Sequence, residues 1–495
     1  MSSGRFVLRL VQANAVFAFL GLLIWTALLR LPFWRHSGID EIFFAVIGRE
    51  WLHGGLPYVA SFDVKPPGLF ALFVLTQLIP VGTILPIKLL GCVAVAASST
   101  GLFLIGRKYF SPEVSLFTAL LYPFCTLFLS GTDVLSETLQ EPFEIFAVLL
   151  LLAPSNQWSL RRIAIAGMLL GTAAMIRQPA VFDLAALGLV VFILGGARRY
   201  VRVVYFLAGA AFVPLCFLLY YLVAGHVREL LDATFLGALA RQQGDTTPFY
   251  LGIFGFFLMQ RPMVGLLALT MLLWVHRDLV RQAGLARPVA IIACWLGGSA
   301  LGVIAVRSMY DHYFLTLIPA MLLLSAVFVF HAGGKLTAWA GNAAPALLLA
   351  AVIVPPLVYV VMSPSIPGDD LAVEQRAAER LRTDGLVNGD RILVLDGGLP
   401  IYLYANATPA VAVFHPEHLL CPFPGAGADP MVDALASTPK FIVIKRNNTH
   451  ISCEMPQRVA ELERTLRDRY TLADTVRGPD EAFELFRLRS SQASR

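Results

Sequence analysis

An acidic pair follows the first long apolar run of the chain, in the stretch Ser37-Gly38-Ile39-Asp40-Glu41, and Lys65-Pro66-Pro67 comes shortly after it. The apolar run, about residues 10–31, is long enough to cross a membrane, since a spanning helix needs roughly 17–25 residues. Charged groups are costly at a membrane and usually have a function there. The stretch therefore predicts a membrane fold with a candidate base and a candidate anion-binding cation near the membrane surface.

The composition of the whole chain agrees with a membrane protein. Of its 495 residues, 57% are hydrophobic and 14% are charged, whereas soluble domains have roughly 25% charged residues. The basic residues are scattered between apolar runs rather than gathered on one soluble face, so the sequence predicts no nucleic-acid partner. No cleavable signal is expected, because the first run lacks a small-residue cleavage site before Pro32.

The apolar runs predict a polytopic α-helical protein with about 11 membrane spans. The expected spans cover about 10–31, 84–106, 113–131, 141–154, 162–177, 179–197, 201–224, 249–275, 288–306, 312–331 and 342–363. Short loops that carry Arg or Lys fall on one side if the N-terminus is cytoplasmic. The outer side then holds two long segments, about 32–83 and 225–248, and everything after residue 364.

The outer segments differ from the spans in character. Residues 41–52 form a helix-like pattern with Phe43, Ile47 and Trp51 on one face, which predicts a helix lying along the membrane surface. Beyond the membrane domain, 1–364, the chain becomes charged and soluble. Strand-like runs (391–395, 410–414, 441–444 and 483–488) alternate there with helical stretches (369–384, 429–437 and 456–469). This alternation predicts a small α/β domain over 365–495.

The outer domain contains a glycine pair after a predicted strand, and two cysteines. Asp396-Gly397-Gly398 follows a predicted strand but lacks the spacing of a dinucleotide-binding motif. Cys421 and Cys453 would form a disulfide in an oxidising compartment. The alternative for the cysteines is two buried thiols.

Asp40 is the candidate general base of the outer face. An ionised carboxylate near a helix N-terminus stays charged and is held in place, and it can accept a proton from a hydroxyl. The alternative is an N-cap that only closes the helix. Glu41 is a second candidate at the same site, for catalysis or for contact with a substrate.

Lys65 stands before two prolines. A residue before proline is extended, and proline suits the first turn of a helix, so Lys65 is presented from a stiff elbow. We expect a phosphate contact, for which lysine is a compact charge. The alternative is a lysine that reaches toward the membrane interface.

Further polar residues fall at the outer ends of later spans. Candidate cations are Arg177, Arg241 and Arg307, and each of them would otherwise anchor a helix end. His312 and Tyr313 follow Arg307 closely. Buried or boundary acids are expected at Asp133, Glu137, Glu141, Glu144 and Asp183. None of these sets has metal-ligand spacing, so no metal site is assigned.

At these residues the chain resembles the GT-C fold glycosyltransferases, in the bacterial branch related to protein O-mannosyltransferases and to the aminoarabinose transferase of lipid A. The resemblance lies in Asp40-Glu41, the 41–52 stretch with Gly55-Leu56-Pro57-Tyr58 after it, and Lys65-Pro66-Pro67. Weaker matches are Glu141, Arg177, and His312-Tyr313 followed by Pro319. The resemblance covers the whole membrane region, and a periplasmic C-terminal domain also agrees with it.

The resemblance implies a sugar transferase of the bacterial inner membrane. Its donor would be a sugar on polyprenyl phosphate, and its acceptor would be a cell-envelope glycan such as lipopolysaccharide, a lipid such as lipid A, or a protein. Asp40 would be the base of an inverting reaction. Lys65 with Arg177, Arg241, Arg307, His312 and Tyr313 would bind the donor, and Tyr58 and Glu141 would contact the sugar or the acceptor.

One departure limits what the resemblance implies. Relatives that modify lipid A often have Glu directly before the lysine, where this chain has Val64 and places Asp63 one residue earlier. This departure is an argument against both a metal site and an aminoarabinose substrate, so a divalent cation stays open as a cofactor and none is assigned. Two other classes remain as alternatives: a transporter or flippase, which would place charges near the membrane midplane, and an inactive subunit, which would lack Asp40 or Lys65.

Overall fold

The computed structural model describes residues 15–79, 82–240, 261–307, 310–332, 370–395, 397–420, 429–446, 456–479 and 481–489. By its internal contacts the chain forms two compact units. The first consists of Met1–Pro32, Leu89–Tyr220 and Thr246–Pro364, and the second of Phe33–Lys88, Tyr221–Asp245 and Ser365–Arg495. Residues 1–364 thus contribute to both units, since the two expected outer segments group largely with the C-terminal region. Arg241, Cys421 and Cys453 lie outside the described residues.

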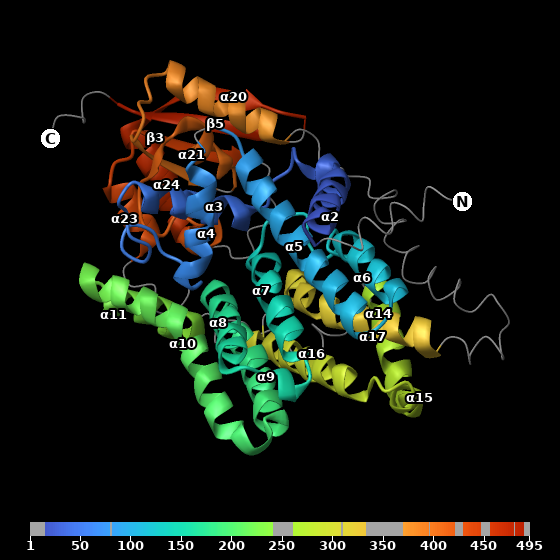
Figure 1. The fold of residues 1–495 in the computed structure, drawn as a ribbon. Helices are drawn as coiled ribbons and strands as arrows, with labels where there is room; N and C mark the ends of the chain where they lie inside the picture. The colour runs from blue at the N-terminus through green and yellow to red at the C-terminus, as the bar shows by residue number, and fades with distance from the viewer. Residues whose placement is uncertain are drawn as a thin grey trace. The chain divides into compact units, whose positions relative to one another are not determined.

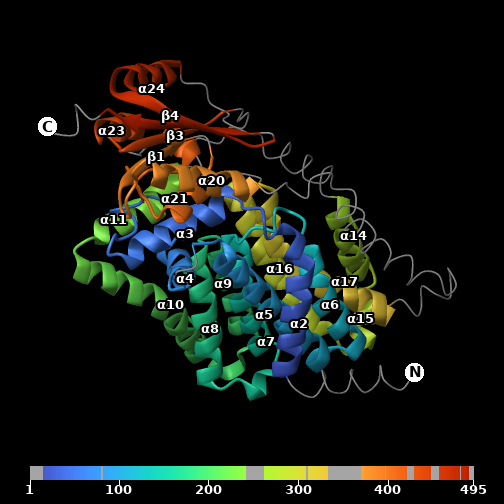
Figure 2. The same cartoon turned by 90° about the horizontal axis from the view of Figure 1, so that it is seen from above.

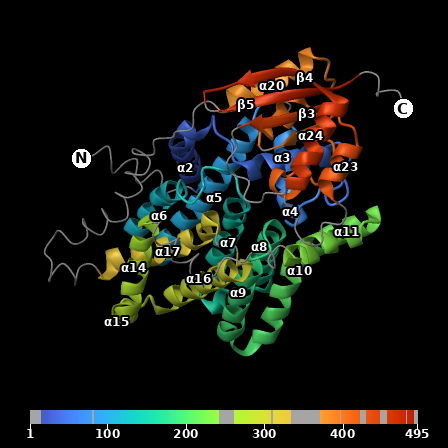
Figure 3. The same ribbon diagram turned by 180° about the vertical axis from the view of Figure 1, so that it is seen from behind.

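The first unit is built from apolar helices (Figures 1 and 3). In chain order they are α2 (Ala15–Arg30), α5 (Leu85–Tyr109), α6 (Pro112–Cys125), α7 (Ser136–Leu151), α8 (Leu160–Ile176), α9 (Ala180–Leu194), α10 (Arg199–Ala224), α14 (Arg261–Val275), α15 (Arg277–Gln282), α16 (Ala286–Val306) and α17 (Ile318–Val327). Helix α5 begins and α10 ends in the second unit. A 3-10 turn, Asp311–Leu317, leads into α17, and a π turn, Phe328–Ala332, follows it.

These helices confirm the prediction of a multi-pass helical membrane protein. Five stretches of the described chain are long and apolar enough to cross a membrane by length and composition alone: Ala15–Phe33, Leu85–Tyr109, Gly196–Ala224, Ala286–Val306 and Asp311–His331. The other expected spans coincide with shorter helices in their described parts. The expected span at 342–363 lies outside the described residues.

Small residues let two of these helices approach closely. A Cβ atom added to Gly167 in α8 would lie 2.0 Å from the carbonyl oxygen of Phe206 in α10, and one on Gly171 would lie 2.1 Å from that of Ala210. Backbone contact through glycines four residues apart is a common way for membrane helices to associate. Elsewhere in the unit α7 packs along α8, and α9 along α16 (Figure 3).

Two expected helix boundaries were wrong. Helix α6 ends at Cys125 rather than near residue 131, and Leu129 and Ser130 adopt positive φ. Helix α7 starts at Ser136 rather than 141. Its first turn includes Glu137, an acid favoured there by the helix dipole. Because the apolar run begins only after these polar residues, a prediction from hydrophobicity placed the start of α7 too late.

The second unit combines short helices with a five-stranded sheet (Figure 2). Its helices are α3 (Ile39–Leu52), α4 (Pro67–Gln77), α11 (Val227–Leu231), α20 (Asp370–Thr383), α21 (Pro400–Ala405), α22 (Pro416–Leu420), α23 (Pro430–Ala436) and α24 (Pro456–Arg469), with a π turn at Asp232–Gly237. Its strands are β1 (Arg391–Leu395), β2 (Thr408–Pro409), β3 (Phe441–Arg446), β4 (Tyr470–Arg477) and β5 (Ala482–Leu488). The α/β prediction for this region is confirmed.

The sheet has the order β2-β1-β3-β5-β4. Strands β2, β1 and β3 are parallel, while β5 is antiparallel to β3 and to β4. Leu393 and Ile442 belong to a core with residues of α23 and α24, and α20 and α21 lie on the other side of the sheet (Figure 2). Strand β1 is buried along 392–395, which explains its continuous apolar sequence.

The expected strand at 410–414 was wrong. The second strand ends at Pro409, which has no N–H to donate to a ladder. Ala410 makes one more backbone bond, to the carbonyl of Ile392 at 2.9 Å, and the chain then leaves the sheet. Ala412 accepts a hydrogen bond from the Phe62 amide at 2.9 Å, and the Phe414 ring centroid lies 4.7 Å from that of Phe43 in α3. The alternating apolar pattern thus serves packing against the segment that carries Asp40.

Candidate functional site

Asp40 is the second residue of α3, and Gly38 is the N-cap. The carboxylate is therefore in the first turn without being the cap, so the capping alternative was wrong. Its side chain is 41% exposed, and its Oδ1 lies 3.7 Å from Nε2 of His415. The free N–H groups of a first turn favour a negative charge. The helix thus offers an accessible carboxylate with a histidine beside it.

Glu41 is engaged differently from its neighbour. It is fully buried, and its Oε1 accepts hydrogen bonds from the Gly38 amide at 3.1 Å and from the Lys88 ammonium at 2.5 Å. This buried ion pair joins the start of α3 to the first turn of α5. The predicted roles of Glu41 stay predictions, but its contacts are those of a residue that fixes Asp40 in place.

Lys88 was missed by the sequence analysis. It lies in the expected span that begins near residue 84, and its side chain is 3% exposed. A charged residue within an apolar helix needs a partner. That lone lysine in an apolar run was the signal that could have found the pair.

Lys65 stands on the predicted proline elbow. Pro66 is the N-cap of α4 with extended φ and ψ of −67° and 154°, and Pro67 begins the helix. The Lys65 side chain is half-buried. Its carbonyl accepts a hydrogen bond of 2.6 Å from the Tyr58 hydroxyl, so the backbone that presents the ammonium is fixed from both sides.

Tyr58 is part of this support. It is buried, with a positive φ of 70°, and its ring centroid lies 5.8 Å from that of Tyr221. Burial raises the pKa of the Tyr58 hydroxyl well above its usual value. Because the hydroxyl donates its hydrogen bond to the Lys65 carbonyl, it holds the backbone before the two prolines in place. Its expected contact with a sugar or acceptor stays a prediction.

The residues before Lys65 are also buried. Val64 lies near the π turn, since a Cβ on Gly237 would be 3.2 Å from its Cγ1. Asp63 is 4% exposed, and its Oδ1 accepts a hydrogen bond from the Val64 amide at 2.6 Å. The side chain at position 64 is therefore buried beside the π turn.

Arg49 ties α3 to the C-terminal region. It is 6% exposed and donates to the carbonyls of Tyr402 at 2.6 Å and Ala407 at 2.5 Å, while Glu50 forms an ion pair with it at 3.0 Å. Burial lowers the pKa of the Arg49 guanidinium and the Glu50 charge opposes that effect. A buried arginine with these carbonyl acceptors fixes the helix that carries Asp40.

In the first unit, Arg177 follows the last residue of α8. Its Nε lies 2.7 Å from Oε1 of Glu137, and its guanidinium lies 4.8 Å from the centre of the Tyr313 ring. The residue is 2% exposed. Within the described part of the chain, its Nη2 is buried and has no hydrogen-bond partner. A buried, unused N–H group is costly, and an anionic oxygen would satisfy it.

Other candidates gather at the same end of the helices. A Cβ on Gly302 would lie 3.0 Å from the Pro179 carbonyl, so the end of α16 lies beside the start of α9. Arg307 caps that end of α16, is exposed, and has a positive φ of 63°. The His312 ring stacks on that of Tyr310 with centroids 5.6 Å apart. The structure thus brings Arg177 and Tyr313 into contact and places Arg307 at the same helical end.

Several acids are buried in the same unit. Glu141, Glu144 and Asp183 are at most 2% exposed, and Asp183 accepts a hydrogen bond of 2.7 Å from Ser299. Both carboxylate oxygens of Glu141 are buried without a hydrogen bond among the described residues. Glu141 lies well inside α7, whereas the sequence placed it at the helix start. In the described ranges, no group of three His, Cys, Asp or Glu side chains has the arrangement of a metal site.

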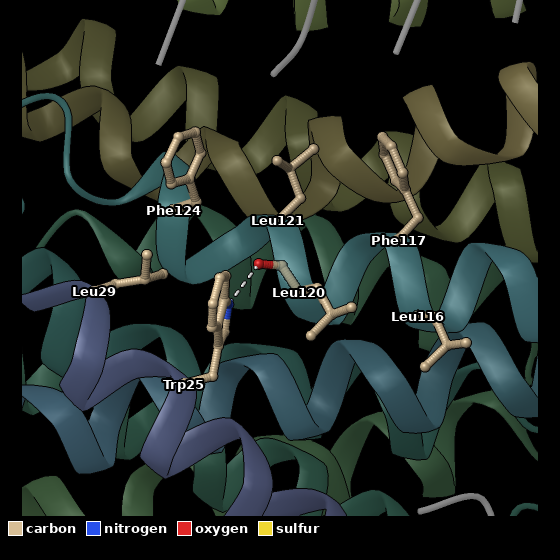
Figure 4. A pocket seen from close by; sticks show the side chains of 7 residues that line it. All are labelled: Trp25, Leu29, Leu116, Phe117, Leu120, Leu121 and Phe124. Carbon is tan, nitrogen blue, oxygen red and sulfur yellow. Dashed lines mark hydrogen bonds between the residues drawn. The ribbon is translucent and has the colours of Figure 1, made fainter. Parts of the chain in front are cut away.

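An apolar pocket of about 440 Å³ lies between α2 and α6 (Figure 4). It is lined by Trp25, Leu29, Leu116, Phe117, Leu120, Leu121 and Phe124. Its one indole N–H is used, since Trp25 donates to the Leu120 carbonyl at 3.0 Å (Figure 4). The lining offers no charge and suits a hydrocarbon chain rather than a sugar.

Comparisons with known proteins agree with this architecture. Residues 64–221 match the family described as dolichyl-phosphate-mannose-protein mannosyltransferase. A search of curated proteins finds no significant match. Among solved structures, ArnT from Cupriavidus metallidurans in the apo state is similar with a TM-score of 0.59 and 16% identity, over 95% of this chain and 98% of that one.

A second similar structure is the archaeal oligosaccharyltransferase AglB from Archaeoglobus fulgidus, in complex with an inhibitory peptide and a dolichol-phosphate. It has a TM-score of 0.50 and 14% identity, over 86% of this chain and 69% of that one. The predicted resemblance is confirmed at the level of fold: the chain is a multi-pass membrane protein with the GT-C fold of membrane glycosyltransferases.

Proposed function

We propose that the protein is a glycosyltransferase that moves a sugar from a polyprenyl-phosphate donor to a cell-envelope acceptor. The acceptor would be one of three kinds: a glycan such as lipopolysaccharide, a lipid such as lipid A, or a protein. It would be reached at the periplasmic face of the bacterial inner membrane. The GT-C fold supports the reaction class. The observation that carries the assignment of the site is the half-exposed Asp40 carboxylate in the first turn of α3, directly before the part of the helix that is buried from Glu41 to Arg49.

The proposed chemistry needs one base and one stabilised leaving group. The acceptor oxygen attacks the anomeric carbon and its proton passes to the Asp40 carboxylate. The bond between that carbon and the phosphate oxygen breaks, and polyprenyl phosphate leaves with the electron pair. Attack opposite the leaving group inverts the configuration. Holding donor and acceptor in this geometry supplies a further large part of the rate.

The leaving phosphate carries the developing charge, so its stabilisation is a main contribution. In the second unit we assign this role to Lys65, because its backbone is fixed by Tyr58 and Pro66. In the first unit we assign phosphate contacts to Arg177, whose buried Nη2 has no partner in the described chain, and to the exposed Arg307. These assignments are tested separately, unit by unit.

The test uses full-length protein in vesicles with a polyprenyl-phosphate sugar. The donor and acceptor are first identified by mass spectrometry of envelope glycans from cells with and without the protein. We expect Asp40→Asn to lower turnover by about 10²–10⁴, and Lys65→Ala or Arg177→Gln by about 10²–10³. Asp433→Asn is the matched control, since Asp433 is an exposed acid in the first turn of α23. Near-normal turnover in both Asp40→Asn and Lys65→Ala would show that the site is assigned wrongly.

A further inference from the structure

We propose that a second pocket in the first unit binds one anionic phospholipid, independently of sugar transfer. The pocket has a volume of about 490 Å³ and is lined by Leu104, Arg107 and Lys108 of α5, Leu149 and Leu150 of α7, and Arg162 of α8. This volume lies within the roughly 300–1,000 Å³ of small-molecule sites. The lining consists of three cations and three leucines. The cations suit the anionic headgroup of a lipid, and the leucines suit its acyl chain.

The charge of the pocket has one sign. No acid lines it, and in the described part of the chain none of the three cations forms an ion pair. Arg107 and Lys108 are exposed, and the Lys108 ammonium lies 5.3 Å from the centre of the Tyr109 ring. Uncompensated positive charge beside an apolar surface favours an anion that carries hydrocarbon.

Arg162 gives the strongest indication of a ligand. Its side chain is half-buried, and its Nη1 is buried without a hydrogen-bond partner among the described residues. A buried donor left unpaired costs roughly 1–3 kcal/mol. A phosphate oxygen in the pocket would accept this bond, and charge on both partners would strengthen it.

The position of the pocket suits a lipid. Arg107 and Lys108 are in the last turn of α5, Leu149 and Leu150 are at the end of α7, and Arg162 is in the first turns of α8. The site is therefore at the ends of the helices, at the level of lipid headgroups. Leu104 lies one turn further into α5, so an acyl chain can run from the cations along the leucines. Basic pockets between membrane helices are known to hold anionic headgroups, and the distribution of basic loops predicts that this end is cytoplasmic.

The experiment compares lipid binding by matched arginine variants of the purified full-length protein in neutral detergent. Phosphatidylglycerol, phosphatidylcholine and soluble glycerol phosphate are titrated, with binding followed by native mass spectrometry and by thermal unfolding. We expect phosphatidylglycerol to bind and to stabilise the protein, and Arg162→Gln to weaken that binding about tenfold. Arg161→Gln is the control, because Arg161 is its exposed neighbour on α8 and does not line the pocket. Arg162→Lys should restore part of the affinity.

Other outcomes would overturn the proposal. Equal loss of lipid in the Arg161 and Arg162 variants would show unspecific charge attraction. Equal binding of phosphatidylcholine would exclude recognition of the anionic headgroup, and equal stabilisation by glycerol phosphate would show a soluble-phosphate site instead. If Arg162→Gln does not fold, the double variant Arg107→Gln/Lys108→Gln decides, since both residues are exposed: unchanged phosphatidylglycerol binding in it overturns the proposal, and weaker binding supports it.

Discussion

His415 and Asp40 lie side by side, with Nε2 of the histidine 3.7 Å from Oδ1 of the aspartate. The histidine comes from the segment before α22, its side chain is 11% exposed, and its ring packs edge-on against Phe43. The distance is longer than a hydrogen bond, so we expect the histidine to act on the carboxylate by packing beside it. The C-terminal region thereby supplies a neighbour for the proposed base.

We expect His415→Ala to lower kcat about tenfold, which corresponds to about 1.4 kcal/mol of activation free energy. The KM for the donor should change little, because His415 is proposed to position Asp40 rather than to bind the donor. The measurement is steady-state transfer, with kcat and KM determined separately. His53→Ala is the control, since His53 is exposed at the other end of α3. An unchanged kcat would remove His415 from the site.

The buried pair of Lys88 and Glu41 should be sensitive to the loss of one partner. Lys88→Met removes the cation that pairs with a buried carboxylate, and we expect it to lower the free energy of unfolding by about 3–5 kcal/mol. The double variant Lys88→Met/Glu41→Gln should recover more than half of that loss. Unfolding in detergent measures both. Lys445→Met, which breaks the more exposed pair with Glu481, should cost about 1 kcal/mol or less. Equal effects of the two lysine changes would contradict a buried pair.

The contact of α8 with α10 should tolerate no side chain at Gly167. Gly167→Ala places a methyl group within 2.0 Å of the Phe206 carbonyl oxygen, so the helices must separate, and we expect a loss of about 1–3 kcal/mol. Gly297→Ala in α16 meets no atom within 4 Å. It should be neutral or slightly stabilising, since alanine favours a helix over glycine by about 1 kcal/mol. Thermal unfolding of the two variants compares them directly, and an equal response would show that α8 and α10 do not touch there.

Asp390 should make stability depend on acid pH. Burial raises the pKa of its carboxyl, but hydrogen bonds from Lys440 and the Val387 amide, with the lysine charge, outweigh this and lower the pKa. A lowered folded-state pKa stabilises above the unfolded-state value, near pH ~4, and the stabilisation is lost as the pH falls below it. The difference in Tm between wild type and Asp390→Asn should therefore be present at neutral pH and shrink toward about pH 3. A difference that is constant with pH would contradict the charge interaction.

The sequence predicts the local features of this protein well. Apolar runs indicate most of the helices, and the proline pair indicates the start of α4 after Lys65. These features depend on neighbours in the chain, so composition and spacing suffice. The start of α7 was placed too late because Ser136 and Glu137 are polar yet helical.

What depends on distant contacts was not predicted. His415 lies beside Asp40 only because the segment after β2 leaves the sheet, and its alternating apolar pattern is also typical of a strand. The pairing of Lys88 was not predicted, because its partner Glu41 lies in another helix, 47 residues earlier in the chain. Such pairings follow from tertiary packing, and a single sequence carries no direct signal of them.

The hydrogen bonds from Arg49 to two backbone carbonyls connect residues that are synthesised at very different times. Helix α3 leaves the ribosome early, whereas the carbonyls of Tyr402 and Ala407 that receive its arginine are synthesised near the end. Until then the guanidinium lacks these two acceptors, and α3 lacks its connection to the C-terminal region. A prematurely ended chain would therefore contain Asp40 and Lys65 but would lack the carbonyl acceptors that hold the other end of α3.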